Sequence, residues 1–145
     1  MSVKNFFTKE EQKQIVAAIQ AAEKETSGEI RLHLESRCKG DPLQRAILIF
    51  QKLKMHETKQ RNGTLIYLAV KDRKFAIFGD EGINKVVPEN FWEDVKEIMR
   101  NHFSKGEFLQ GILAGIERIG EKLKTYFPYQ QDDVNELSDE ISMGD

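Results

Sequence analysis

Two apolar stretches separated by a short charged turn constrain the fold of this chain more than any other feature. Residues 65–70, LIYLAV, are apolar without alternation, which is typical of a strand buried on both faces. Residues 71–74, KDRK, turn the chain, and residues 75–78 return as a paired strand. The sequence therefore predicts a β-hairpin over residues 63–80 at the centre of the fold.

Helix and strand patterns flank this hairpin on both sides. Thr8 followed by Glu11 has capping-box spacing and opens a first helix. Residues 29–36 alternate as a strand with one wet face, and Asp41 with Pro42 begins a helix over 42–56. Pro88 opens another helix, and the last carries an apolar stripe over 108–123. We expect an α/β fold: a small mixed sheet, in which a right-handed parallel β-α-β unit joins the antiparallel hairpin, with helices packed on its faces.

Composition sets the expected organisation and compartment. The length of 145 residues and the 39% hydrophobic content fit one domain, which we place at residues 1–128. Residues 129–145 form an acidic tail that we expect to be disordered or a poorly docked appendage, because residues 130–145 hold six acids and no Lys or Arg. The remainder has 22 basic and 18 acidic residues, too weak an excess to predict a nucleic-acid partner.

Membrane and export signals are missing from the sequence. No run of about 18 apolar residues predicts a membrane span. The N-terminus lacks the apolar region of a signal peptide, and the single cysteine, Cys38, has no internal partner. We therefore expect a cytoplasmic protein.

Acidic residues at the two ends of the hairpin are the candidate binding groups. A seven-residue strand spans about 20 Å at ~3.3 Å per residue, with Asp72 at the closed end and Asp80 at the open end. These two acids cannot share one cation, whose ligands lie about 2.0–2.6 Å from it. The parallel β-α-β unit brings Glu29 to the open end, beside Asp80 and Glu81.

Three interpretations of these acids stay open. At the open pole, the carboxylates of Glu29, Asp80 and Glu81 would suit Ca²⁺ or Mg²⁺. At the closed pole, the candidates are Asp41, Asp72 and Arg73, because ligands of open α/β sheets bind at the carboxyl ends of parallel strands. In the third interpretation all are solvated loop residues, in ion pairs of little energetic value.

Signatures of established phosphatases are absent. Cys38 is followed by Gln44 where a cysteine phosphatase needs Arg, and no aspartyl-phosphate motif, Walker A loop or His-Glu-x-x-His pair is present. His33, His56 and His102 fall in separate predicted elements, so each is expected to be structural. The sequence leaves the catalytic residues, if any, unknown.

Several short motifs resemble those of the TPM domain family. They are residues 27–31 (SGEIR), 61–63 (RNG), 72–74 (DRK), 79–83 (GDEGI), and a Phe103-x₂-Gly-Glu-Phe-x₂-Gly111 pattern. The resemblance spans about residues 8–127. It implies an α/β sandwich, divalent-cation binding in some members, and a proposed acid phosphatase role for the plant member. Arg61 stands where many members have Asp, a departure that bears on any cation site using that aspartate.

Two functions follow as expectations. The first is an interaction module of the TPM type that binds Ca²⁺ or Mg²⁺ through loop carboxylates and contacts an unknown protein or small molecule. The alternative is a metal-dependent hydrolase of phosphate monoesters, similar to an acid phosphatase. In it Asp80 and Glu81 would hold the ion, and Arg61 or Arg73 would stabilise charge.

Overall fold

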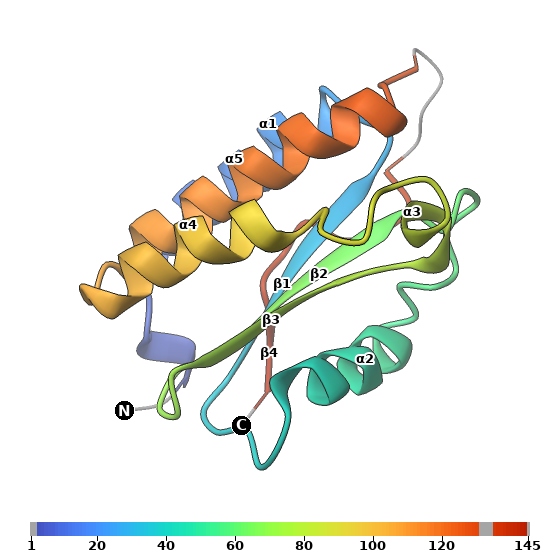
Figure 1. Cartoon of the computed structure of the whole chain (residues 1–145). Helices are drawn as coiled ribbons and strands as arrows, with labels where there is room; N and C mark the ends of the chain where they lie inside the picture. Colours follow the sequence, from blue (N-terminus) through green and yellow to red (C-terminus); the bar gives the residue numbers. More distant parts are fainter. Residues whose placement is uncertain (1–2, 131–134, 145) are drawn as a thin grey trace.

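A four-stranded mixed sheet carries helices on both of its faces (Figure 1). The computed structural model describes residues 3–130 and 135–144. The strands are β1 (Glu29–Glu35), β2 (Gly63–Ala69), β3 (Lys74–Gly79) and β4 (Ser142–Met143), in the order β3-β2-β1-β4. Helices α1 (Lys9–Glu23), α4 (Glu93–Ser104) and α5 (Phe108–Tyr126) cover one face, and α2 (Pro42–Lys52) covers the other. Two short helices complete the elements, η1 (Val3–Asn5) and α3 (Glu81–Asn84).

The register of the sheet confirms the predicted fold class. β1 pairs in parallel with β2, from Glu29 opposite Gly63 to Glu35 opposite Ala69. β2 pairs antiparallel with β3, with Thr64 opposite Gly79. The hairpin therefore lies where the sequence predicts it, and every residue of β2 is buried.

The prediction of a wet face on β1 is wrong. Its apolar residues point into the larger core under α1, α4 and α5, but the opposite face is also covered. Glu29, His33 and Glu35 are only 3–4% exposed. α2 and the C-terminal segment lie over this side of the strand, and polar partners satisfy most of its charged groups. Alternation alone could not distinguish a solvated face from a covered polar one.

Helix boundaries depart from expectation at two places. α4 begins at Glu93 with Trp92 as its N-cap, because the residues that follow Pro88 form turns instead of the first helical turn. α2 ends at Lys52, and Lys54 then adopts a φ of 58°. The capping box of α1 is confirmed. Thr8 Oγ1 accepts from the Glu11 amide at 3.0 Å, and Glu11 Oε1 accepts from the Thr8 amide at 2.9 Å.

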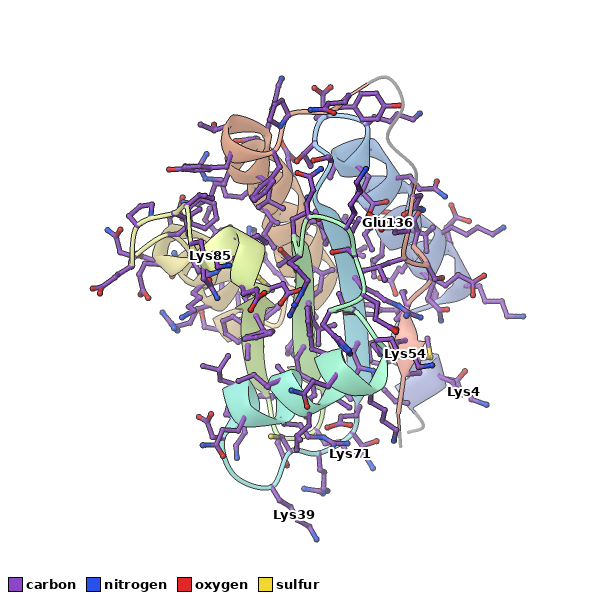
Figure 2. All side chains as sticks on the ribbon, turned by 90° about the vertical axis from the view of Figure 1, so that its right-hand side faces the viewer. Lys4, Lys39, Lys54, Lys71, Lys85 and Glu136 are labelled. Atoms are coloured by element: carbon purple, nitrogen blue, oxygen red, sulfur yellow. The ribbon has the colours of Figure 1, made fainter. Side chains whose placement is uncertain are left out.

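The C-terminal segment is docked where it is described. Residues 135–144, called here the strap, run along the edge of β1 and end in β4 (Figure 2). Ile141 and Met143 pack against the larger core, which gives the segment an apolar anchor that a count of its charges overlooks. The sequence predicts a disordered or poorly docked tail over residues 129–145; residues 135–144 lie against the sheet, and residues 131–134 and 145 lie outside the described residues. Within residues 3–130 and 135–144, no helix has the length and apolar character to cross a membrane.

Candidate functional site

The predicted open-pole acids lie at the same end of the sheet. Glu29 is the register partner of Gly63, and the Asp80 amide donates to the Gly63 carbonyl at 2.9 Å. Both residues thus flank one position of β2. Their side chains nevertheless belong to two different groups of contacts.

Arg61 holds the carboxylates of Asp80 and Glu81. Its Nε and Nη2 donate to the two oxygens of Asp80 at 2.8 and 3.0 Å, and its Nη1 donates to Glu81 at 3.0 Å. Asp80 is 3% exposed and also accepts from the Glu81 amide at the start of α3. Bidentate pairs of this kind are strong and directional. The charges of Asp80 and Glu81 are therefore largely compensated within the chain.

Glu29 has no basic partner among the described residues. Its Oε1 accepts from the Leu137 amide at 2.7 Å, whereas its Oε2 is buried with no hydrogen-bond partner in the described part of the chain. Burial raises the pKa of Glu29 to about 7 and the nearby Glu136 carboxylate adds to the rise, while the backbone amides of Leu137 and Glu136 oppose it. An unsatisfied buried oxygen is costly, so this carboxyl is a group in need of a proton or a cation.

Two further acids accompany Glu29. Glu23, in the last turn of α1, accepts from the Ile30 amide at 3.0 Å and is hydrogen-bonded to Asp139 of the strap. Burial, followed by the neighbouring Asp139 carboxyl, raises the pKa of Glu23 to about 9. We call Glu23, Glu29 and Asp139 the clasp. The three line one pocket of about 310 Å³, together with Tyr129.

The sequence interpretation missed Glu23 and Asp139. The sequence held one signal for Glu23. An acid in the last turn of a helix interacts unfavourably with the helix dipole, so its presence there indicates another role. Asp139 carried no signal of its own, since a single acid within an acidic tail is ordinarily solvated. Only the docking of the strap brings it to Glu23.

The clasp is not preassembled as a metal centre. Among the described residues, no group of three or more His, Cys, Asp or Glu side chains stands in an arrangement that could hold an ion. Hard cations need several oxygen ligands at about 2.0–2.6 Å. A cation at the clasp would therefore have to draw the strap and the carboxyls closer together.

The closed-pole candidates do not form one site. Asp72 accepts from the Cys38 amide at 2.8 Å and from Arg37 at 3.0 Å. Asp41 caps α2 by accepting from the Gln44 amide, and the Arg73 guanidinium lies 5.6 Å from the centre of the Phe108 ring. Each has a separate structural role.

A buried polar network lies farther along β1. Arg45 donates to both oxygens of Glu35 at 2.8 and 3.0 Å, and the Tyr67 hydroxyl donates to the same carboxylate. Burial alone would raise the pKa of Glu35, but the bonds from Arg45 and Tyr67 hold it below its usual range. Burial lowers the pKa of His33, whose Nδ1 contacts Ser142 Oγ at 2.8 Å. The charge of Glu35 is thus matched internally, unlike that of Glu29.

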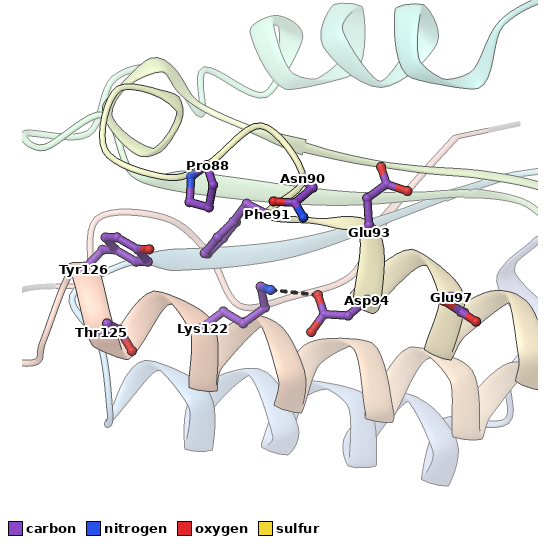
Figure 3. Close-up of a pocket in the computed structure, with 9 residues that line it drawn as sticks. All are labelled: Pro88, Asn90, Phe91, Glu93, Asp94, Glu97, Lys122, Thr125 and Tyr126. Atoms are coloured by element: carbon purple, nitrogen blue, oxygen red, sulfur yellow. Dashed lines mark hydrogen bonds and ion pairs between the residues drawn. The ribbon is translucent and has the colours of Figure 1, made fainter.

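A second pocket lies beside the start of α4, and its acid Asp94 also has basic partners within the chain (Figure 3). Lys122 donates to Asp94 at 2.7 Å and lies 4.6 Å from the centre of the Phe91 ring. Arg118 binds the other oxygen of Asp94 at 2.8 Å. The clasp is therefore the stronger candidate, because no basic side chain among the described residues pairs with its acids in this way.

Comparison with known proteins places this geometry in a family. The profile described as the TPM domain matches residues 2–122. The chain is similar to the NMR structure of the BA42 protein from the psychrophilic bacterium Bizionia argentinensis, with 48% identity, a TM-score of 0.93 and 99% coverage of each chain.

More distant structures share the fold. An N-terminal domain from P. gingivalis is 15% identical, with a TM-score of 0.69 over 83% of this chain and 78% of that one. The N-terminal domain of cg2496 from Corynebacterium glutamicum is 14% identical, with a TM-score of 0.67 over 92% and 84% of the two chains. No curated protein matches the chain.

Proposed function

The chain belongs to the TPM domain family, and from that premise we propose that it is a binding module that takes a divalent cation, Ca²⁺ or Mg²⁺, at the clasp. The observation that carries the proposal is the Glu29 carboxyl, 3% exposed and with Oε2 unpaired. Its neighbours in the pocket, Glu23 and Asp139, offer further carboxylate oxygens, the ligands that both ions prefer. Glu29 is the residue that this proposal shares with the open-pole expectation.

The proposed binding is coupled to protons. Glu23 and Glu29, with pKa values raised to about 9 and about 7, must lose protons to ligate a cation. We expect cation binding to release protons and to strengthen as the pH rises from 7 to 9. Since no ready-made ligand set exists in the described residues, binding is expected to be weak and to reposition the strap.

A Ca²⁺ and Mg²⁺ titration followed by backbone amide shifts tests the proposal. Binding at the clasp predicts shifts at Gly28 and Leu137, and their loss in the Glu29→Gln variant. Asp80→Asn is the matched control, because Asp80 is equally buried at the same end of the sheet but is held by Arg61. Shifts confined to residues 79–82, or retained in Glu29→Gln and lost in Asp80→Asn, would move the site to the Arg61 pair. No shifts at all would end the cation proposal.

The hydrolase alternative has less support from the contacts. It requires Asp80 and Glu81 to hold the ion, yet both are bound by Arg61, and a cation there would have to displace a bidentate guanidinium. A phosphate monoester assay with Mg²⁺ separates the two functions. Turnover abolished by Asp80→Asn and unaffected by Glu29→Gln would favour the hydrolase.

A further inference from the structure

The strap rests on the edge of the sheet through a short set of contacts. β4 pairs with β1 at two positions, whereas β2 pairs with it along all of β1. The Gly144 amide donates to the Leu34 carbonyl at 2.8 Å at one end, and the Leu137 amide donates to Glu29 at the other. Segments with so few buried bonds open at low free energy. Release of the strap would leave the β1 edge unpaired, and such edges accept extended segments.

The seat of the strap has a readable chemical pattern. Ile141 and Met143 pack against the larger core, while Ser142 between them reaches His33. Asp139, two residues before Ile141, enters the clasp. An extended segment that fits this seat therefore presents apolar side chains at alternate positions and one polar side chain to Glu23 and Glu29.

The acids Glu23 and Glu29 of the clasp would be stabilised by a positive charge, but the strap places a third carboxyl, that of Asp139, beside them. Glu29 is 3% exposed with Oε2 unpaired, which is evidence for a missing donor that does not depend on the number of acids nearby. The other ionisable groups around the clasp are Lys24 and Tyr129, which line its pocket, and Glu136 of the strap; Arg31 of β1 donates instead to the Glu140 carbonyl. Asp139 faces the carboxyls of Glu23 and Glu29 in the same pocket, and its Oδ1 is buried without a hydrogen-bond partner among the described residues. A Lys or Arg would satisfy both carboxylates without a proton, and the 310 Å³ pocket has room for a longer side chain.

We propose that the seat of the strap is a docking site for an extended segment of a partner protein that places a Lys or Arg between Glu23 and Glu29. Apolar residues two and four positions later in that segment occupy the places of Ile141 and Met143. In the structure the strap occupies this seat, and its Asp139 presents a like charge to Glu23 and Glu29. The inference rests on the binding-module proposal and names the chemistry of the partner.

Two labelled peptides test the partner chemistry on the full chain. One has the sequence of residues 135–144, and the other carries Asp139→Lys. At pH 8 we expect the substituted peptide to bind at least tenfold more tightly, measured by fluorescence anisotropy, and to lose that advantage with the Glu23→Gln chain. Gln is isosteric with protonated Glu, so the variant keeps the bond to Ile30 and the fold. Equal affinities of the two peptides, or an advantage that survives Glu23→Gln, would overturn the proposal.

Amide hydrogen exchange tests the release of the strap. Because β4 pairs with β1 at two positions only, we expect Gly144 to exchange through local opening and to be much less protected than Ile66 in the central strand. An excess of the Asp139→Lys peptide should lower the protection of Gly144 further and leave that of Ile66 unchanged. Gly144 protection equal to that of Ile66, or unaffected by the peptide, refutes the inference.

The two proposals fail separately. Amide shifts with Ca²⁺ in the absence of peptide discrimination would leave the cation site standing and remove the docking site. Discrimination between the peptides without any response to Ca²⁺ or Mg²⁺ would support the docking site and remove the cation.

Discussion

Replacing Arg45 by Met tests whether the covered polar face of β1 depends on internal charge compensation. The Glu35 side chain is 5% exposed, and Arg45 supplies its ionic partner through two hydrogen bonds. Met keeps the aliphatic part of the side chain and removes the charge. Loss of one partner from a buried pair costs about 3–5 kcal/mol. Arg45 is itself 42% exposed, so water reaches the pair and the lower end of that range applies.

Protonation sets an upper limit on this cost. Without Arg45, Glu35 can take up a proton, and neutralising a carboxyl with an ordinary pKa of 4.5 at pH 7 costs about 3.4 kcal/mol, at 1.36 kcal/mol per unit. We therefore expect Arg45→Met to lower the free energy of unfolding by about 2–3 kcal/mol at pH 7. For a chain of 145 residues this is a fall of about 6–12 °C in Tm, at about 3–4 °C per kcal/mol.

Thermal unfolding followed by circular dichroism, with a matched control variant, checks the expected fall in Tm. Arg118 is also 42% exposed and also holds a carboxylate through Nε at 2.8 Å, but its partner Asp94 is 38% exposed. Arg118→Met should therefore cost less than about 1 kcal/mol. The loss of unfolding free energy in Arg45→Met should become smaller toward pH 5, because protonation of Glu35 then costs less free energy. Combining Glu35→Gln with Arg45→Met should recover part of this loss. Equal losses in the two arginine variants would refute the argument from burial.

Four further substitutions give measurable outcomes in urea unfolding. In Gly82→Ala the new Cβ would lie 2.1 Å from the backbone oxygen of Gln60. This oxygen cannot rotate away, so we expect the free energy of unfolding to fall by about 2 kcal/mol or more. In Gly115→Ala the Cβ meets a flexible methionine sulfur at 2.6 Å, and a fall as large as that of Gly82→Ala would contradict the expectation. Thr8→Ala removes the capping box of α1 and should cost about 1 kcal/mol. The raised pKa of Glu23 means that its contribution to stability is complete below its ordinary value of 4.5 and falls as the pH rises toward 9, so Glu23→Gln should flatten the pH dependence of unfolding between pH 6 and 8; an unchanged slope would show that protonation of Glu23 does not stabilise the fold.

The central sheet was accessible to sequence reasoning because its signals are local. The apolar run of β2, the charged turn and the capping residues each lie within a few positions of the structure they specify. The same local logic brought Glu29 and Asp80 to one end of the sheet, since a parallel crossover fixes which strand ends meet. The sequence prediction was wrong at Pro88, because the residues after it form turns and α4 begins only at Glu93.

The clasp could not be derived in this way because it depends on docking between distant segments. Asp139 belongs to a segment whose charge predicts solvation, yet the apolar contacts of Ile141 and Met143 and the pairing of β4 with β1 hold this segment against the sheet. The pairing of Arg61 with Asp80 was equally hidden. Arg61 has a φ of 51°, a conformation uncommon for a side chain of this kind, and its guanidinium reaches both Asp80 and Glu81.

The contrast between Asp80 and Glu29 explains why carboxyls at one end of the sheet have different capacities. Both are 3% exposed, so solvent does not distinguish them. Asp80 has a guanidinium from its own loop and is satisfied permanently. Glu29 and Glu23 each accept one backbone amide and face a carboxyl from the strap, and no basic side chain among the described residues forms an ion pair with them. A guanidinium partner favours a structural role, whereas acids without a basic partner are open to a cation or to a basic side chain. For this reason we place the proposed site at Glu29, beside the strap, and not at Asp80.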